Sequence, residues 1–121
     1  MKKNLKITPE GTKDFLFAEC SAMDYICTSI EKVFVKGGFK RVITPALEFY
    51  DVFSIPSSGI SQESMFKTTD NKGRILVARP DSTLPIARMV STRLKNNTLP
   101  VRLYYKQAVY RNNPSLAGRR N

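Results

Sequence analysis

A carboxylate and two hydroxyls follow one another in the stretch Arg79-Pro80-Asp81-Ser82-Thr83, directly after an apolar run that is typical of a strand. The proline fixes the backbone of this turn and removes one amide donor. The Asp81 carboxylate can accept a ligand ammonium, and the Thr83 hydroxyl can add a second hydrogen bond. The same pattern is typical of a turn that starts a helix, with Thr83 as its N-cap. Spacing alone leaves both interpretations open and favours the capped turn.

Two arginines further along the chain have the chemistry of an anion clamp. Arg111 ends a predicted strand on the same face as Gln107, where a guanidinium can hold a phosphate or carboxylate through two parallel hydrogen bonds. Arg119 follows Gly118 in a basic loop that can close over the same anion. Solvated surface arginines have the same spacing, and the pattern alone favours them over a binding site.

The sequence lacks the residues that several classes of site require. It contains no histidine, which removes the commonest general base and the commonest zinc ligand. Cys20 and Cys27 lie in one predicted helix, where their spacing puts about 10 Å between their Cα atoms, too far for a disulfide. This spacing also matches no zinc motif. We therefore expect two reduced, structural cysteines, no metal and no cofactor.

No segment of the sequence is suited to a membrane or to export. There is no run of about eighteen apolar residues, and the basic N-terminus lacks the apolar core of a signal peptide. The simplest expectation is a cytoplasmic protein whose 121 residues form no more than one small domain.

The positive charge is concentrated in the second half of the chain. Residues 61–121 carry +9 of the formal net charge of +10. Such a field favours an anionic partner: a nucleotide, a phosphate, a carboxylate ligand or RNA. Strand alternation places Tyr105 opposite Tyr104 and Tyr110, so these rings form no single platform for stacked bases. A nucleic-acid-binding module is therefore an alternative and not the preferred interpretation.

The elements that must position these residues follow from the periodicity of apolar residues. Their order favours an α+β fold with an antiparallel sheet. The predicted elements are a helix over 16–36, an extended segment over 39–51 interrupted by Pro45, a polar loop over 52–64, a hairpin over 65–79 with its turn at 70–73, a helix over 85–95 and a strand over 101–111.

Three of these segments, taken in order, resemble the core of the class II aminoacyl-tRNA synthetases, and the histidyl-tRNA synthetase branch in particular. VITPALEFYD is similar to the first motif of that class, in which the equivalent of Pro45 lies at the dimer interface. RPDST stands where the synthetase has its amino-acid-binding turn, and VRLYYKQAVYRNNPSLAGRR is similar to the start of the second motif. The resemblance covers about residues 7–121.

This resemblance implies a fold and a domain organisation. The implied fold is α+β, the N-terminal part of a class II synthetase-like antiparallel sheet flanked by helices. Residues 1–121 are then an N-terminal fragment of a class II synthetase-like catalytic-core domain, truncated within the second motif.

Within that branch the sequence is most similar to a paralogous family, the regulatory subunits of ATP phosphoribosyltransferase. Asp81-Ser82 replaces the Glu-Gly of the synthetase. Asn113 stands where class II synthetases have a glutamate that helps to recognise the adenine of ATP. Retention of Arg111 without that glutamate implies a chain that binds an anion but does not form an adenylate.

The resemblance also implies a role for each candidate residue. Asp81 and Thr83 match the positions that hold the α-amino group of histidine. Arg111 matches the residue near the ligand carboxylate and α-phosphate, and Arg119 matches a second arginine of the same loop. The implied protein is not an enzyme: it assembles with a short catalytic subunit that condenses ATP with phosphoribosyl pyrophosphate, the first step of histidine biosynthesis. Histidine is the implied effector, and a homodimer through the first motif is the implied self-assembly.

An active histidyl-tRNA synthetase is the alternative that the same motifs leave open. It accounts for the basic second half through tRNA binding, but it does not account for Asn113 or for Asp81-Ser82. An anticodon-binding domain further along the gene would favour the synthetase, and its absence would favour the regulatory subunit.

Overall fold

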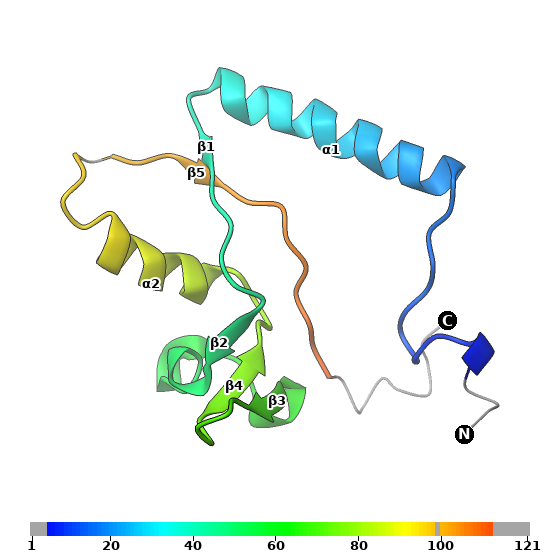
Figure 1. The fold of residues 1–121 in the computed structure, drawn as a ribbon. Helices are drawn as coiled ribbons and strands as arrows, with labels where there is room; N and C mark the ends of the chain where they lie inside the picture. Colours follow the sequence, from blue (N-terminus) through cyan, green and yellow to red (C-terminus); the bar gives the residue numbers. More distant parts are fainter. Residues whose placement is uncertain (1–4, 99, 113–121) are drawn as a thin grey trace. The chain divides into compact units, whose positions relative to one another are not determined.

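The computed structural model describes residues 5–98 and 100–112, and the chain divides after Phe39 into two compact units (Figure 1). Helices and a small antiparallel sheet make up these units, which confirms the predicted α+β class. Within the described ranges, no helix is both long enough and apolar enough to cross a membrane.

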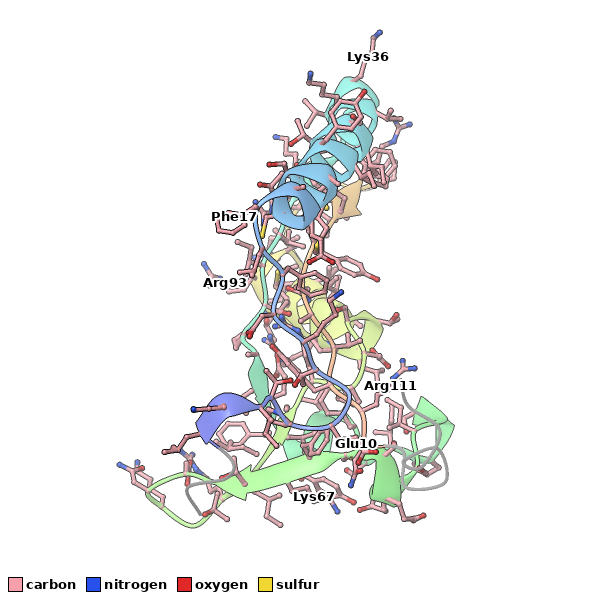
Figure 2. All side chains as sticks on the ribbon, turned by 90° about the vertical axis from the view of Figure 1, so that its right-hand side faces the viewer. Glu10, Phe17, Lys36, Lys67, Arg93 and Arg111 are labelled. Carbon is pink, nitrogen blue, oxygen red and sulfur yellow. The ribbon has the colours of Figure 1, made fainter. Side chains whose placement is uncertain are left out.

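The first unit is built around helix α1, Ala18–Lys36, which confirms the helix predicted over 16–36. The helix ends where the Gly37 amide donates to the Phe34 carbonyl at 3.0 Å. Lys36 projects from this end, where a cation interacts favourably with the helix dipole (Figure 2). None of the helix residues is buried in the part of the chain that the structure describes.

The second unit contains a three-stranded antiparallel sheet in the order β2-β4-β3 (Figure 1). Its strands are β2, Leu47–Phe49; β3, Phe66–Thr69; and β4, Ile75–Ala78. In the register, Val77 of the central strand lies between Glu48 and Lys67. Val77 is fully buried, and it forms the apolar core with Phe53 and Met65. This core supports the end of β4, from which the RPDST turn begins.

The hairpin between β3 and β4 forms at the predicted turn. Asp70 accepts the amides of Lys72 and Arg74 through Oδ1, both at 2.9 Å, and its Oδ2 pairs with the Arg74 guanidinium at 2.7 Å. These contacts, the Arg74 amide first, lower the pKa of the Asp70 carboxyl. Gly73 has a φ of 78°, a conformation that strains any side chain. Local chemistry therefore fixes the register in which β4 enters the sheet.

Three short 3-10 turns replace the predicted polar loop. They are η2, Tyr50–Val52; η3, Pro56–Ser58; and η4, Gln62–Ser64. A 3-10 turn is frequent as a connector between longer elements, which is its role here between β2 and β3.

The strand predicted over 101–111 is present as an extended chain that is paired along a short part of its length. β5, Leu103–Tyr104, runs parallel to β1, Lys40–Arg41. After β5, the Tyr110 amide donates a single backbone hydrogen bond to the Arg79 carbonyl at 2.9 Å, outside any ladder of the described residues. The prediction of one long strand is wrong, because side-chain alternation requires only an extended backbone, whereas a ladder requires a partner strand.

Helix α2, Thr83–Arg93, begins and ends two residues before the predicted range of 85–95. Pro85 falls in its first turn, where a missing amide donor breaks no helical hydrogen bond, and it is fully buried. Figure 1 shows α2 following β4 after one short turn. This turn is the RPDST segment.

Candidate functional site

The RPDST turn is capped by its aspartate. Asp81 accepts the Leu84 amide through Oδ1 at 3.2 Å, so its carboxylate caps α2. The prediction of Thr83 as the N-cap is wrong, because the capping oxygen comes from two residues earlier and Thr83 is the first residue of the helix. Asp81 Oδ2 has no hydrogen-bond partner among the described residues. This oxygen can therefore accept a ligand ammonium while Oδ1 holds the helix.

Arg111 is held against the same turn. Its Nε donates to the Pro80 carbonyl at 2.8 Å, which places the guanidinium beside the residue that precedes Asp81. Arg111 is exposed (Figure 2), and its two terminal nitrogens have no partner within residues 5–98 and 100–112. Such a guanidinium can bind a carboxylate or a phosphate. Within the described residues, the turn thus carries a carboxylate oxygen without a partner, and the guanidinium bonded to its Pro80 carbonyl has two nitrogens without a partner.

Arg79 is the buried residue that ties this turn to the rest of the unit, with 6% of its surface exposed. Its Nε donates to the Ala108 carbonyl at 2.6 Å and its Nη1 to the Thr44 carbonyl at 2.9 Å. Its own amide donates to the Ala46 carbonyl at 2.9 Å. Arg79 therefore joins three segments of the chain. Its guanidinium donates hydrogen bonds to backbone carbonyl oxygens and not to a carboxylate.

Gln107, which is half-buried, forms a second connection between these segments. Its Oε1 accepts the Thr44 amide at 3.2 Å, and its Nε2 donates to Thr44 Oγ1 and to Ser82 Oγ, both at 3.0 Å. Thr44 and Ser82 are each 4% exposed. Sequence reasoning placed Gln107 on the face of Arg111 but gave it no role of its own. A polar side chain among the apolar residues of an alternating strand was the signal for this network.

An ion pair connects α2 to the sheet. Glu48 of β2 is 6% exposed, and its Oε2 lies 3.0 Å from Nη2 of Arg88 on α2. The buried Nε of Arg88 has no hydrogen-bond partner among the described residues. The pair holds the body of the helix whose first turn carries the candidate ligand-binding residues.

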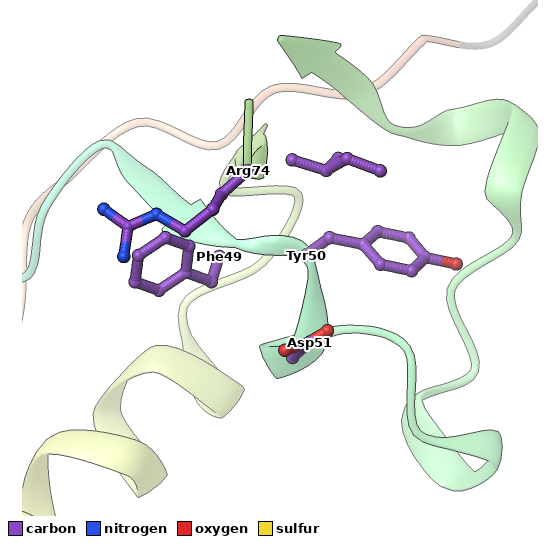
Figure 3. Close-up of a pocket in the computed structure, with 5 residues that line it drawn as sticks. Phe49, Tyr50, Asp51 and Arg74 are labelled. Atoms are coloured by element: carbon purple, nitrogen blue, oxygen red, sulfur yellow. The ribbon is translucent and has the colours of Figure 1, made fainter. Parts of the chain in front are cut away.

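A cavity of about 450 Å³ lies where β2 ends and β4 begins. Phe49, Tyr50, Asp51, Arg74 and Ile75 line it (Figure 3). The Arg74 guanidinium lies 4.8 Å from the centre of the Phe49 ring, and Asp70 neutralises its charge. None of the site residues predicted from the sequence lines this cavity, so the RPDST turn is the better candidate for the functional site.

Pro45 lies in a different hollow, a groove of about 430 Å³ between α2 and the segment that joins β1 to β2. Pro45 is exposed and interrupts the extended chain between these strands, as predicted. The groove also contains Ile43, which is 70% exposed, and Arg88 and Arg93 of α2. The role of Pro45 in a dimer interface stays a prediction.

The structure brings Asp81, Thr83 and Arg111 together at one turn, with Thr83 exposed on the first turn of α2. Arg119 and Asn113 lie outside the described residues. In the described ranges no group of three or more Cys, Asp or Glu side chains has the arrangement of a metal site, and both cysteines are free thiols. The turn thus carries one acidic side chain, and one basic side chain is hydrogen-bonded to its backbone.

The chain matches a known protein family along nearly its whole length. A model described as histidyl-tRNA synthetase matches residues 11–121. The chain belongs to the histidyl-tRNA synthetase family. The match confirms the resemblance to this branch of the class II synthetases that the sequence motifs indicate.

Two curated relatives of the chain have a more specific name. The ATP phosphoribosyltransferase regulatory subunit of Clostridium acetobutylicum is 46% identical over 114 residues, which cover 94% of this chain and 28% of that protein. The regulatory subunit of Bacillus thuringiensis is 41% identical over 121 residues, which cover 100% of this chain and 28% of that protein. The chain therefore spans less than a third of the length of these relatives.

Solved structures of related proteins share the fold. An ATP phosphoribosyltransferase regulatory subunit/histidyl-tRNA synthetase from Bacillus halodurans C superposes with a TM-score of 0.79 at 36% identity, over 88% of this chain and 28% of that chain. The histidyl-tRNA synthetase of Nostoc sp. PCC 7120 superposes with a TM-score of 0.77 at 25% identity, over 89% of this chain and 25% of that chain. These matches confirm a class II synthetase-like fold for a member of the histidyl-tRNA synthetase family.

Proposed function

We propose that this chain belongs to a regulatory subunit of ATP phosphoribosyltransferase and forms the N-terminal part of its class II synthetase-like domain. Identities of 41% and 46% to regulatory subunits over nearly the whole chain support this assignment. The observation that carries it chemically is the RPDST turn held beside Arg111. The partner is a catalytic subunit that condenses ATP with phosphoribosyl pyrophosphate in the first step of histidine biosynthesis.

The effector in this proposal is histidine, a zwitterion. Asp81 Oδ2 and the Thr83 hydroxyl accept and orient its ammonium, and the terminal nitrogens of Arg111 bind its carboxylate. This division is supported by the contacts within the turn, since Oδ1 of Asp81 and Nε of Arg111 already have backbone partners. Arg119, which the resemblance assigns to the same motif, adds a second cation for the carboxylate.

Control of the catalytic subunit follows from linkage. Histidine changes activity only to the extent that it binds one state of the complex more tightly than another. The candidate site is suited to such coupling, because the turn between β4 and α2 is hydrogen-bonded to the segment after β5 there. A ligand that bridges Asp81 and Arg111 favours the arrangement in which these segments are close together.

The proposed subunit is not itself an enzyme. Asn113 replaces the glutamate that the resemblance assigns to adenine recognition. An asparagine amide carries no charge, so the contact to the adenine amino group is weakened at that position. The subunit therefore binds histidine without activating it.

Replacement of Asp81 by asparagine is expected to weaken histidine inhibition of the reconstituted complex about 10- to 100-fold, because a charge-assisted hydrogen bond is lost. Asparagine keeps an oxygen acceptor for the Leu84 amide, so the start of α2 is preserved. The measurement is the rate of the catalytic subunit with the full-length gene product at increasing histidine, with calorimetry of histidine binding alongside.

Asp51→Asn is the matched control, since it removes an exposed carboxylate from η2 and leaves the RPDST turn unchanged. Unchanged histidine inhibition in the Asp81 variant would refute the assignment of this residue. Histidine-dependent pyrophosphate exchange by the protein alone, at synthetase-like rates, would instead favour the histidyl-tRNA synthetase alternative.

A homodimer through the first motif is the second part of the proposal. Pro45 and its neighbour Ile43 are exposed and apolar, which supports an interface at this segment. Pro45→Glu is expected to weaken the dimer at least about tenfold in sedimentation equilibrium, because the interface would bury an unpaired charge. Pro56→Glu, at an exposed proline of η3, is the control. Equal dimer stability in both variants would place the interface elsewhere.

A further inference from the structure

We propose that Ser82 and Gln107 are positioning residues that set the distance between the two halves of the ligand site. They form, with Thr44, a hydrogen-bonded group of side chains that we call the Gln107 clamp, in which Thr44 and Ser82 are buried and Gln107 is half-buried. The ligand in this inference is the histidine of the proposed function, on which its binding test rests. The clamp itself is a property of the fold and has a test of its own.

The clamp uses nearly all the hydrogen-bonding capacity of one amide. Gln107 Oε1 accepts the Thr44 amide at 3.2 Å, and the two hydrogens of Nε2 go to Thr44 Oγ1 and Ser82 Oγ, both at 3.0 Å. Thr44 and Ser82 are 4% exposed, so water cannot readily replace these bonds. The orientation of the Gln107 side chain is therefore fixed from two sides.

The position of the clamp in the chain gives it a function. Ser82 lies between Asp81 and Thr83, and Gln107 lies four residues before Arg111. The Ser82–Gln107 bond joins residues 25 apart in sequence. It therefore connects the segment that would receive the ligand ammonium to the segment that would receive the carboxylate. A change in this bond alters the spacing of the two charges.

The residue at position 82 sets whether this bond exists. The resemblance gives the synthetase a glycine at this place, and a glycine has no side chain to bond Gln107. In this chain the serine hydroxyl is buried rather than directed to solvent. The turn is thus tied to the segment after β5 through a side chain, in addition to the backbone bond from Tyr110 to Arg79.

The clamp is distinct from the contacts that hold the fold together. Arg79 joins the same segments through the carbonyls of Ala108 and Thr44, and the apolar core lies around Val77. Loss of one neutral hydrogen bond at Ser82 leaves these contacts in place. The expected effect of breaking the clamp is a local loosening of the site.

The first test is amide hydrogen exchange of the full-length gene product, read on the segment opposite the substitution. Ser82→Ala is expected to accelerate exchange in peptides over 108–112, and Gln107→Ala in peptides over 79–86, each about tenfold. Peptides of the β3–β4 hairpin are expected to be unchanged. Equal acceleration in the hairpin, or no acceleration across the clamp, would overturn the proposal.

The second test separates positioning from stability by comparing histidine with histidinol, which lacks the carboxylate. The affinity ratio of the two ligands measures how well Asp81 and Arg111 act together. We expect this ratio to fall about 5- to 10-fold in Ser82→Ala and in Gln107→Ala, and the double variant to lose less than the product of the two effects. Ser82→Thr, which keeps the hydroxyl, is expected to retain the greater part of the ratio.

Ser91→Ala is the matched control, because it removes another serine hydroxyl from α2, one that bonds only the Arg88 carbonyl of its own helix. An unchanged ratio in both clamp variants would overturn the positioning role. If the unmodified protein binds no histidine, the proposed function fails, and the exchange experiment alone decides whether the clamp exists.

Discussion

Replacement of Arg79 by methionine is expected to lower the free energy of unfolding of the full-length protein by about 3–5 kcal/mol, because two hydrogen bonds from a charged donor, one buried and one partly buried, are lost. In the native structure the guanidinium donates to the carbonyls of Ala108 and Thr44 at 2.6 and 2.9 Å. Both carbonyls lose this donor in the variant. Methionine retains an unbranched apolar stem, so the loss is not mainly that of packing. Urea denaturation measures the effect.

Arg79→Lys separates charge from geometry. Lysine keeps the positive charge, but its single ammonium lacks the planar fork that reaches two carbonyls on different segments. We expect about half of the loss seen with methionine. A loss below about 1 kcal/mol in the methionine variant would show that Arg79 does not hold these segments together.

Replacement of Glu48 by alanine is expected to lower the free energy of unfolding by about 3 kcal/mol, since it leaves the cation of a partly buried ion pair without its partner. Glu48 is almost fully buried, whereas the side chain of Arg88 is 37% exposed. Water can therefore solvate part of the orphaned guanidinium, which keeps the expected loss near the lower end of the range for buried pairs. Thermal or urea denaturation of the full-length protein is the measurement.

The double variant Glu48→Leu with Arg88→Met is expected to recover most of that loss, because neither charge then remains buried. Glu63→Ala, at an exposed glutamate of η4, is the control for the loss of a surface carboxylate. If the double variant is less stable than the single one, the pair contributes more than the cost of its desolvation, and our reason for the effect is wrong.

The elements with strong local signals could be predicted from the sequence. Helix α1 and the β3–β4 hairpin form where apolar periodicity and turn residues place them. Asp70, Arg74 and Gly73 show why the hairpin was predictable, since every contact that shapes its turn lies within five residues. Interactions between residues of the same turn can therefore be predicted from a single sequence.

The extent of pairing along residues 101–111 could not be predicted in the same way. Alternation indicates an extended chain, and the chain is extended, but the pairing of β5 depends on β1, more than sixty residues earlier. Pairing over so long a separation is set by the tertiary fold and not by the strand itself. The start of α2 was displaced for a different, local reason, since both Asp81 and Thr83 have side chains suited to a cap.

The charged residues of the candidate site were predicted from the sequence, whereas the residues that hold them in place were not. Asp81 and Arg111 were recognisable from residue type and motif order. The contacts of Arg79 and Gln107 join residues 25 to 63 positions apart, so no local pattern reveals them. In particular, the sequence alone suggests that an arginine such as Arg79 lies on the surface, because arginines are mostly exposed.

The interior connections of this site are insensitive to protons. The amide of Gln107 and the hydroxyls of Ser82 and Thr44 do not ionise near neutrality. The chain contains no histidine of its own. Acidification therefore leaves the Gln107 clamp in the same protonation state, so its hydrogen bonds to Ser82 and Thr44 are expected to persist at any pH at which the protein is folded.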